Sequence, residues 1–588
     1  MTNLEIAKLI RKVAAAYTVM GENFFKIQAY DKAADSIEHA TSEVKDLFES
    51  GRLDKLPGVG EHIKNYLVEL FKKGRVKHFE EVMGKLPKGM FEILDVPGIG
   101  PKTAYKIAKE LGVSSVSGLK EAAASGRLAR IPGLGSKTSQ EILKGIDEVT
   151  RRGSRMLLPY AWNLANDIVT SLKKSPDILE AYSLGSLRRT VATIGDIDIA
   201  ASTNDPLKAI NFFIKLPQVE RVTDKGEHKA TVVMKNGKQV DFMVTSPERF
   251  GALLQHFTGS KMHNIHLRKL ANEKGLSLSE YGISKVHEKG NQFASDLLAK
   301  CENEEEFYKI LGMDYVPPEL REDAGEIERA VAHKLPKLVE LKDIKGDLHV
   351  HSSFNTQTSH DLGANSLREL AEHAKNQGYE YIAIADHNPS VSGHTQAQVE
   401  WLLAKRLKLI EQINSSRGIK LLNSLEVDIL ADGTLAVQDK ILSGLDLVVA
   451  SVHSSFGQGV DAMTKRVMKA LRNPNVDILG HPTGRLIGSR EGYELHWEKI
   501  FKVCQKKQKA LEINAWPERL DLPDTLVREA ITNGVKLVIS TDAHAKDQMD
   551  NMRFGVAVAR RGWATKTDIL NCFSWVDFSK YFRIKSKE

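Results

Sequence analysis

The stretch Tyr182–Ala200 reads Y-S-L-G-S-L-R-R-T-V-A-T-I-G-D-I-D-I-A, and it decides the fold of the middle of the chain. Apolar and polar residues alternate in it around Asp196 and Asp198. A β-strand has a period of two, so both carboxylates project from one face of the predicted strand. Neighbouring carboxylates repel each other, and burial strengthens the repulsion. We therefore expect a divalent cation such as Mg²⁺ between the two side chains.

Two further features extend this predicted site. The alternating run Q-V-D-F-M-V at 239–244 predicts a strand that carries a third carboxylate, Asp241. Upstream, the Gly185-Ser186 turn offers N–H groups and a hydroxyl to phosphate, and Arg189 adds bidentate donors. The D-x-D pair alone would be read as solvated aspartates on a strand edge, but the turn and the third carboxylate favour a functional site. The pattern G-S…D-x-D…D resembles the palm of the nucleotidyltransferase superfamily.

The segment H-F-T-G-S-K-M-H-N-I-H-L-R at 256–268 narrows this resemblance. It resembles the nucleotide-binding stretch F-T-G-S…N…R of the family X DNA polymerases, the relatives of polymerase beta. The resemblance implies that the catalytic, Mg²⁺-binding residues are Asp196, Asp198 and Asp241. It also implies these nucleotide contacts: Gly185, Ser186 and Arg189 at the triphosphate, Phe257 and Gly259 at the sugar, Asn264 at the minor-groove edge of the new base pair, and Arg268 at the template strand.

The chain departs from that family pattern at two places. Many relatives have Gly and then Glu after the arginine pair, whereas this chain has Thr190-Val191-Ala192. An arginine common after the third aspartate, which would modulate the catalytic aspartates in the resting state, is replaced by Met243. Because the three metal carboxylates are present, we expect polymerase activity with weaker fidelity or altered nucleotide handling. A polymerase-inactive repair nuclease, whose palm only binds nucleotide, is the alternative.

A short motif recurs three times in the first 150 residues, which have the apolar periodicity of helices. The copies are L-P-G-V-G at 56–60, V-P-G-I-G at 96–100 and I-P-G-L-G at 131–135. Proline stops the incoming helix, glycines allow close approach of a ligand, and the next helix begins with free N–H groups suited to phosphate. The three copies resemble helix-hairpin-helix motifs, which grip DNA backbones without reading sequence. The expected DNA contacts are Gly58, Gly60, Gly98, Gly100, Lys102, Gly133, Gly135 and Lys137.

The first copy lies where family X polymerases carry an N-terminal domain that binds the 5′-phosphate side of a gap. The run F-K-I-Q-A-Y at 25–30 also resembles that domain. In relatives with 5′-deoxyribose-phosphate lyase activity, a Schiff-base lysine lies six residues beyond the last glycine of the motif. Tyr66 occupies that position here, and Lys64, two residues away on a helix, points elsewhere. We therefore expect this domain to bind DNA without lyase chemistry.

After Lys345 the chain alternates strand-like runs ending in histidines and acids with helical stretches, such as 366–378 and 397–414. Strand–helix alternation with polar groups at strand ends is typical of a (β/α) barrel, in which ligands gather at the C-terminal mouth. H-x-H and D-x-H each place two ligands on one strand face. Imidazole together with carboxylate suits Zn²⁺, Mn²⁺ or Fe²⁺ rather than Ca²⁺. Because eight or nine such groups exceed one tetrahedral site, we expect two or three ions.

This set of motifs resembles the PHP domain (polymerase and histidinol phosphatase) that is attached to many bacterial and archaeal family X polymerases. The metal ligands that the resemblance implies are His349, His351, His387, Glu426, His453, His481, Asp542 and His544, with Glu426 as the bridge. A ninth ligand normally follows the H-x-H motif; we prefer Asp361, with His360 as the alternative. Asp386 is expected to orient a ligand histidine, and Arg485 to contact phosphate.

The composition of the chain limits what can be expected of its partners, disulfides and location. The 588 residues carry 83 basic and 76 acidic side chains, and this mild excess permits nucleic-acid binding without arguing for it. Three scattered cysteines fit a reducing cytosol and make disulfides or zinc fingers unexpected. We see no signal peptide and no apolar run of about 18 residues, so we expect a cytoplasmic monomer without a membrane span.

The predicted fold class is multidomain: a helical helix-hairpin-helix region, an α+β nucleotidyltransferase palm with a thumb, and a (β/α) barrel of PHP type. The expected domains are 1–85 (N-terminal DNA binding), 86–150 (fingers), 151–245 (palm), 246–322 (thumb), 323–344 (linker) and 345–588 (barrel). By resemblance the chain is a DNA polymerase that uses gapped or primed DNA and dNTPs with Mg²⁺ in repair. The barrel, with Zn²⁺ or Mn²⁺, is expected to be a 3′–5′ exonuclease, and a small-molecule phosphatase is its alternative.

Overall fold

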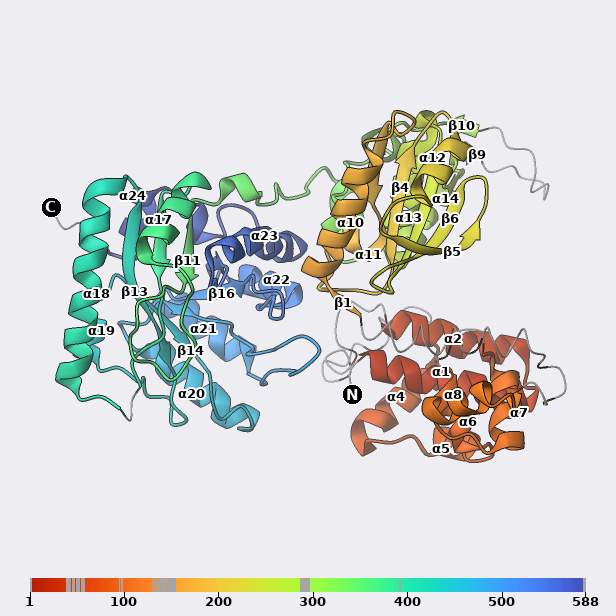
Figure 1. Cartoon of the computed structure of the whole chain (residues 1–588), viewed down its shortest axis with the longest axis horizontal. Coiled ribbons are helices and arrows are strands. Elements are labelled where there is room, and N and C mark those ends of the chain that lie inside the picture. The colour runs from red at the N-terminus through yellow and green to blue at the C-terminus, as the bar shows by residue number, and fades with distance from the viewer. Residues whose placement is uncertain are drawn as a thin grey trace. The chain divides into compact units, whose positions relative to one another are not determined.

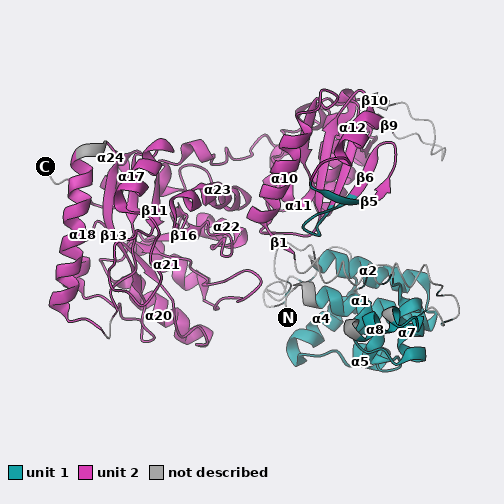
Figure 2. Ribbon diagram, in the orientation of Figure 1, with its two compact units in different colours: residues 1–154, 218–221, 232–239 teal, residues 155–217, 222–231, 240–588 magenta. Residues whose placement is uncertain are grey.

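The chain falls into two compact units, drawn in Figures 1 and 2. The first comprises 1–154 with 218–221 and 232–239, and the second holds the rest of the chain. The computed structural model describes residues 3–38, 44, 48, 53, 59–94, 96, 99–128, 131, 134, 142, 155–285, 297–390 and 393–584. Within these described ranges, no helix is long and apolar enough to cross a membrane.

The N-terminal part of the first unit is helical over its described residues up to 128, as its periodicity predicts. Its long described helices are α1 (Asn3–Met20), α2 (Phe24–Glu38), α4 (Glu61–Lys73), α5 (Lys77–Met83), α6 (Lys88–Ile93), α7 (Pro101–Leu111) and α8 (Val116–Ala124). Ile6, Ile10 and Val13 recur on one face of α1, and all three are fully buried in the core of this unit. Burial of that stripe, rather than helix propensity, stabilises these helices.

The palm is a five-stranded sheet in the order β2-β4-β7-β6-β5. Its strands are β2 (Glu180–Ser183), β4 (Ile197–Ser202), β5 (Val219–Lys225), β6 (Lys229–Met234) and β7 (Gln239–Thr245). Its helices are α10 (Leu158–Leu172), α11 (Gly185–Arg188) and α12 (Pro206–Phe213), and a small ladder joins β1 (Met156–Leu157) to β3 (Thr193–Ile194). The alternating run that contains Asp198 therefore forms β4, which pairs in parallel with β7.

The thumb follows the palm and has its own core. It contains α13 (Phe250–Thr258), α14 (Lys261–Glu273), the three-stranded sheet β8 (Leu276–Ser279), β9 (Gly282–Lys285) and β10 (Leu297–Ala299), and α15 (Glu304–Ile310). The next helix, α16 (Glu326–Val331), belongs to the stretch expected as a linker. Ile327 and Ala330 are buried in the thumb core, so this part of the stretch packs on the thumb.

The C-terminal region is a seven-stranded parallel sheet in sequential order. Its strands are β11 (Gly346–Val350), β12 (Tyr381–Ile384), β13 (Lys420–Asp428), β14 (Leu447–Ser451), β15 (Ile478–Leu479), β16 (Ala510–Asn514) and β17 (Leu537–Ser540). A parallel bridge between Val350 and Ala543 brings the first strand to the last, so the sheet is a nearly closed barrel. This confirms the predicted (β/α) barrel.

Helices link the barrel strands and cover the outside of the sheet (Figure 1). They are α17 (Leu367–Asn376), α18 (Gln396–Arg417), α19 (Asp439–Leu442), α20 (Val460–Arg472), α21 (Trp497–Lys507), α22 (Asp524–Thr532), α23 (Met552–Arg561) and α24 (Trp575–Tyr581). Strands such as β11 and β14 are buried along their whole length, as expected for strands enclosed on both faces. The C-terminal ends of the parallel strands therefore meet at one mouth of the barrel.

Candidate metal centres

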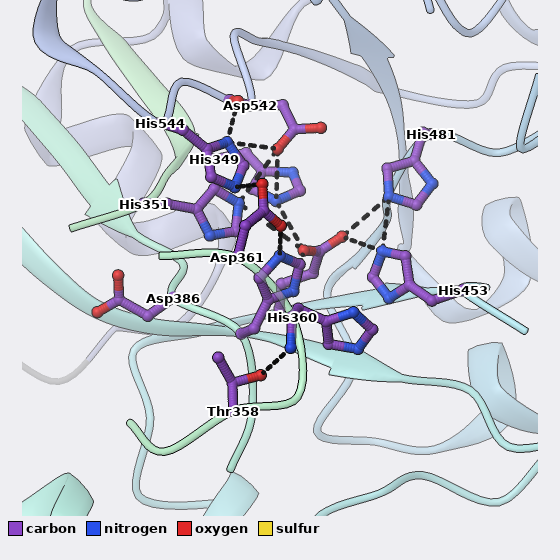
Figure 3. A network of polar contacts seen from close by, with 12 residues as sticks. His349, His351, Thr358, His360, Asp361, Asp386, His453, His481, Asp542 and His544 are labelled. Atoms are coloured by element: carbon purple, nitrogen blue, oxygen red, sulfur yellow. Dashed lines mark hydrogen bonds and ion pairs between the residues drawn. The ribbon is translucent and has the colours of Figure 1, made fainter. Parts of the chain in front are cut away.

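Six strand ends of the barrel bring their histidines and acids together at one mouth (Figure 3). β11 and the residue after it supply an H-x-H pair, β13 supplies a glutamate, and the residues after β12, β14, β15 and β17 supply the others. The eight residues that the sequence places here are His349, His351, His387, Glu426, His453, His481, Asp542 and His544. The structure thus gathers all eight in one cluster, although they are spread over nearly 200 residues of sequence.

Glu426 lies at the centre of this cluster. Its Oε1 is 3.2 Å from His453 Nε2 and 2.9 Å from His481 Nε2. Its Oε2 is 2.9 Å from His387 Nδ1 and 3.4 Å from His349 Nε2. One carboxylate therefore faces two groups of imidazoles through its two oxygens, which is the geometry of a carboxylate that bridges neighbouring ions.

The charged side chains of the cluster shift one another's pKa values. Burial by itself would raise the pKa of Glu426, but His453, His349 and His387 hold that pKa well below its ordinary value. Burial would lower the pKa of His387, yet Glu426 and Asp361 raise it to about 10. Carboxylate and imidazole thus stabilise each other's charged forms within a site closed to solvent.

Two imidazoles of the cluster behave in the opposite way. Burial lowers the pKa of His351 to about 3 and that of His481 to about 4. A metal ion binds the neutral form of imidazole through a nitrogen lone pair. These two side chains are therefore held in the protonation state that ligation requires.

Both candidates for the ninth ligand reach the cluster. The Asp361 carboxylate lies between His387 and His544, with closest approaches of 3.6 Å and 3.3 Å, although its side chain is 76% exposed. His360 lies on the other side and groups with His387 and His453. The two positions that the sequence offered as alternatives therefore occupy different sides of the mouth (Figure 3).

Several polar atoms of the cluster lie close to charged neighbours but make no hydrogen bond, which fits a metal centre. In the described part of the chain, His349 Nε2, His387 Nδ1, Glu426 Oε2 and His544 Nε2 are buried and make no hydrogen bond. Buried polar atoms without partners are rare, and each requires an explanation. Imidazole and carboxylate donors whose atoms lie within 4.8 Å of one another in four groups suit Zn²⁺ or Mn²⁺.

Sequence reasoning missed three residues that orient these ligands. Glu512, on β16, lies with Oε1 2.8 Å from His349 Nδ1, and its Oε2 accepts the backbone N–H of His481. Asn514 donates to both Glu512 and Asp542. Asp428 lies 2.7 Å from His453 Nδ1. The signal for the β16 pair was available, because A-L-E-I-N is one more apolar strand with acid and amide at its end.

Two supporting roles expected from the sequence are corrected by the structure. Asp386 accepts hydrogen bonds from Ser352 and from Arg406, and thereby fixes the loop after His351 instead of orienting a histidine. Arg485 is half-buried and donates to the backbone carbonyls of Arg519 and Leu520, so its guanidinium builds a loop.

Arg519, which the sequence did not single out, faces the metal cluster instead. Its Nε lies 3.4 Å from Asp542 Oδ2. Among the described residues, its terminal nitrogens make no hydrogen bond. A guanidinium with free donors beside a cluster of ligands is well suited to a phosphate group.

The palm aspartates form the second candidate centre. Asp198 on β4 and Asp241 on β7 are direct neighbours in parallel register, and Asp196 immediately precedes β4. Burial, Asp241 and Asp196 raise the pKa of Asp198 from 3.8 to about 6, against the opposing effect of Lys229. The three carboxylates repel one another, so this donor set fits a divalent cation with a preference for oxygen.

The turn before the palm aspartates also belongs to this centre. Gly185 has φ +59°, and a Cβ at this position would lie 2.9 Å from Asp198 Oδ2. Only glycine therefore fits here without displacing the carboxylate. Two residues after Arg188, Thr190 has φ +55°, a left-handed conformation that strains a β-branched residue.

The expected nucleotide contacts lie on α11, α13 and α14. Arg189 donates to Glu322 and to the carbonyl of Thr258, while Phe257 is half-buried. Asn264 donates to the carbonyl of His256 and accepts from Gln255, so both ends of its amide are engaged. Ser186 is half-buried beside the turn glycine, Gly259 packs against Arg189, and Arg268 is exposed on α14. Their roles toward nucleotide stay predictions.

Two of the three helix-hairpin-helix copies are described in part. Gly60 and Gly100 are the N-cap residues of α4 and α7, and both have extended backbone and open space around them. Lys102 is exposed on the first turn of α7. Each last glycine thus precedes a helix, as predicted. The other expected DNA contacts, Gly58, Gly98, Gly133, Gly135 and Lys137, lie outside the described residues.

Family models match the chain in four places. A helix-hairpin-helix domain matches residues 1–76, a tandem of such motifs 91–148, the DNA polymerase beta thumb 253–322, and the PHP domain 347–515. These matches lie in the helical region, the thumb and the barrel as far as residue 515, and they agree with the fold described above.

Relatives of the chain separate into full-length and partial ones. It is 36% identical over 586 residues to the DNA polymerase/3′-5′ exonuclease PolX of Bacillus subtilis, which covers 99% of this chain and 100% of that protein. It is 24% identical to DNA polymerase lambda of Rattus norvegicus over 54% of this chain and 56% of the relative. A probable phosphatase of a Thermoanaerobacter species is 26% identical over 38% of this chain and 89% of its own length. Because identity to PolX extends from end to end, the chain belongs to the family X DNA polymerases that carry a C-terminal PHP domain.

Proposed function

We propose that this chain fills gaps in DNA with its palm and removes nucleotides from 3′ ends with its barrel. The observation that carries the proposal is the parallel register of Asp198 and Asp241 in a chain whose second ligand cluster surrounds Glu426. The full-length relative of Bacillus subtilis, named as a DNA polymerase/3′-5′ exonuclease, supports the same pair of activities.

In the palm, the protein positions the reacting groups and neutralises charge. Mg²⁺ held by Asp196, Asp198 and Asp241 would lower the energy of the 3′-hydroxyl attack and of the pyrophosphate that leaves. The Gly185-Ser186 turn places N–H and hydroxyl donors beside these carboxylates for the triphosphate. The helix-hairpin-helix units hold the backbone of a gapped duplex, because helix N-termini favour phosphate.

In the barrel, the histidines and carboxylates hold ions, and the neighbouring side chains hold the substrate. Two or three Zn²⁺ or Mn²⁺ ions in this cluster would supply Lewis acidity and an activated water for phosphodiester hydrolysis. Glu512 and Asp428 fix the orientation of His349 and His453, which keeps the donor atoms aimed at the ions. Arg519 contacts the scissile phosphate and neutralises the charge that develops there. The enzyme acts as a cytoplasmic monomer.

Primer extension on gapped DNA tests the proposal. The unmutated chain, Asp196→Ala and His349→Ala are each given a primer labelled at its 5′ end, with Mg²⁺ and dNTPs or with Mn²⁺ alone. We expect Asp196→Ala to lose extension and keep degradation, and His349→Ala to do the reverse. Absence of extension by the unmutated chain would leave a repair nuclease whose palm only binds nucleotide, the alternative that Thr190-Val191-Ala192 and Met243 leave open.

A small-molecule phosphatase is the second candidate for the barrel alone. Its support is the series of relatives named as probable phosphatases, which match only this part of the chain. Hydrolysis of a 3′-labelled oligonucleotide is compared with hydrolysis of p-nitrophenyl phosphate under the same Mn²⁺ concentration. Faster turnover of the monoester would favour the phosphatase, and we expect the oligonucleotide to be preferred.

A further inference from the structure

Helix α23 of the barrel packs against the palm and the thumb within the second compact unit. At its start, Phe554 meets the ring of Trp162 on α10 edge to face, with centroids 6.1 Å apart. At its end, Arg560 donates to Glu319 of the thumb at 2.7 Å. This one helix therefore connects the barrel to both parts of the polymerase region.

The last residue of α23, Arg561, enters the palm itself. Its Nη1 donates to the backbone carbonyl of Arg189 at 2.8 Å and to Glu322 Oε1 at 2.9 Å. The same oxygen of Glu322 accepts from Arg189 Nε at 3.0 Å. Asp524 on α22 accepts from Arg561 Nε at 2.7 Å, which fixes the guanidinium from the barrel side.

These three side chains form a nearly dry arrangement of two guanidiniums around one carboxylate. The exposed fractions are 11% for Arg189, 11% for Glu322 and 7% for Arg561. Burial would raise the pKa of Glu322, but Arg189 and Arg561 together hold it below its ordinary value. Removing one member of such a buried group leaves the others with uncompensated charge, so their positions depend on all three.

The arrangement reaches the nucleotide segment through Arg189. Its Nη1 donates to the carbonyl of Thr258 at 2.5 Å, and a Cβ on Gly259 would lie 3.1 Å from that same Nη1. Arg189 is also the C-cap residue of α11, where its backbone N–H donates to the carbonyl of Gly185. A contact made by the barrel thus ends at residues that the sequence predicts to lie beside the incoming nucleotide.

We propose that Arg561 of the barrel is a positioning residue for nucleotide binding in the palm. It holds Glu322 and the Arg189 backbone, and thereby sets the place of the Arg189 guanidinium and of the Thr258 carbonyl that it contacts. This inference rests on the proposed polymerase function. If Arg561 has this role, the barrel supports the polymerase site in addition to carrying its own metal cluster. Removing the barrel would then weaken nucleotide binding in the palm.

The test uses Arg561→Ala, with Arg560→Ala as its matched control. Both variants remove an arginine of α23 that bridges to the polymerase region, but only Arg561 contacts Glu322 and Arg189. We expect Arg561→Ala to raise the KM for dNTP about tenfold with a smaller change in kcat, because a shift of about 1 Å in a positioning group costs up to about 100-fold. Arg560→Ala keeps KM within about twofold, since a distant contact has little effect.

Two further measurements separate positioning from general stability. Degradation of a 3′-labelled oligonucleotide by the barrel should be unchanged in both variants, and Arg561→Lys, which keeps the charge but loses the planar fork, should give an intermediate KM. An equal KM in Arg561→Ala and Arg560→Ala overturns the inference, and so does an equal loss of extension and degradation in Arg561→Ala.

A second measurement distinguishes a failure of the proposed polymerase function from a failure of the inference about Arg561. Affinity for dATP with Mg²⁺, measured by calorimetry on chains carrying the His349→Ala change, requires no primer extension. Weaker dATP binding in Arg561→Ala than in Arg560→Ala would support the inference even if the unmutated chain did not extend primers. Equal dATP binding in the two variants would overturn it.

Discussion

The barrel and the palm each gather carboxylates for divalent ions, but they balance the charge differently. In the barrel, Glu426 is fully buried and has five histidines within 3.8 Å. In the palm, Asp198 faces two other carboxylates, and the nearby cation, Lys229, pairs with Asp241 at 2.7 Å. Burial therefore accompanies a lowered pKa for Glu426 and a raised pKa for Asp198.

This difference teaches how each site obtains its ions. The barrel ligands compensate one another before any ion binds, so the protein alone provides a preorganised site with nitrogen and oxygen donors. The palm ligands are three oxygens in a half-open site, and Mg²⁺ keeps waters and binds most readily together with substrate phosphates. We expect resident ions in the barrel and ions that arrive with nucleotide in the palm.

The largest effect expected from this comparison is a reciprocal loss of activity. Glu426→Gln should reduce 3′-end degradation roughly 1,000-fold and leave extension intact, because the carboxylate that faces both groups of imidazoles is lost. Asp198→Asn should reduce extension to a similar degree and leave degradation intact. Initial rates on one gapped substrate measure both, and a parallel loss of the two activities in either variant would mean that the sites are not independent.

The second-largest expected difference between the barrel and the palm is in the metal ions that each retains. After gel filtration in buffer without added metal, we expect elemental analysis to find two or three transition-metal ions per chain and no Mg²⁺. His453→Ala should lower the count by about one ion, since each ion needs three or more protein ligands. His496→Ala, which removes a histidine paired with Asp461 away from the cluster, is the control. Retention of a full set of ions by His453→Ala would contradict the cluster as described.

The residues that orient the ligands should have a moderate effect. Asp428→Asn should weaken metal affinity of the barrel roughly 10–100-fold, because the carboxylate no longer fixes His453 and His360. Asp432→Asn is the matched control, since that aspartate pairs with Lys469 on the surface. Competition with a fluorescent chelator measures both affinities, and equal values for the two variants would remove Asp428 from the site.

The smallest effect is on the pH dependence of stability without metal. The pKa of Asp198 rises from 3.8 to about 6, so the folded chain binds more protons than the unfolded chain between these values. The resulting destabilisation is small near pH 4, grows as pH rises, and is complete above pH 6. Asp198→Asn in EDTA should therefore raise Tm by about 2–4 °C at pH 8 and by less at pH 5.

The same Tm measurement on Glu426→Gln provides the comparison from the barrel. Its carboxylate has a lowered pKa, so it stabilises the fold above the ordinary pKa of glutamate. The amide should lower Tm at pH 8 in EDTA, which is the opposite sign from Asp198→Asn. A rise of Tm in both variants would show that the barrel cluster is strained by its charges, as the palm is.

The sequence alone predicted which side chains gather at both centres. D-x-D and H-x-H mark the ends of strands, although Asp196 lies just before β4 and His351 just after β11. Strand–helix alternation predicts a barrel whose mouth collects strand ends. For this reason the palm aspartates and the eight barrel ligands were predictable from short stretches. The same local reasoning predicted that α4 and α7 begin just after glycine.

Only the tertiary structure decided which partner each polar group meets. The sequence pointed to Arg485 as a phosphate contact and not to Arg519, yet in the structure Arg485 donates to backbone carbonyls and Arg519 lies beside Asp542. Glu512 meets His349 across 163 positions, and Arg561 meets Arg189 across 372. Side-chain direction along a strand is set by neighbours in the chain, whereas contacts across a barrel or between domains depend on how distant surfaces pack, which no local pattern encodes.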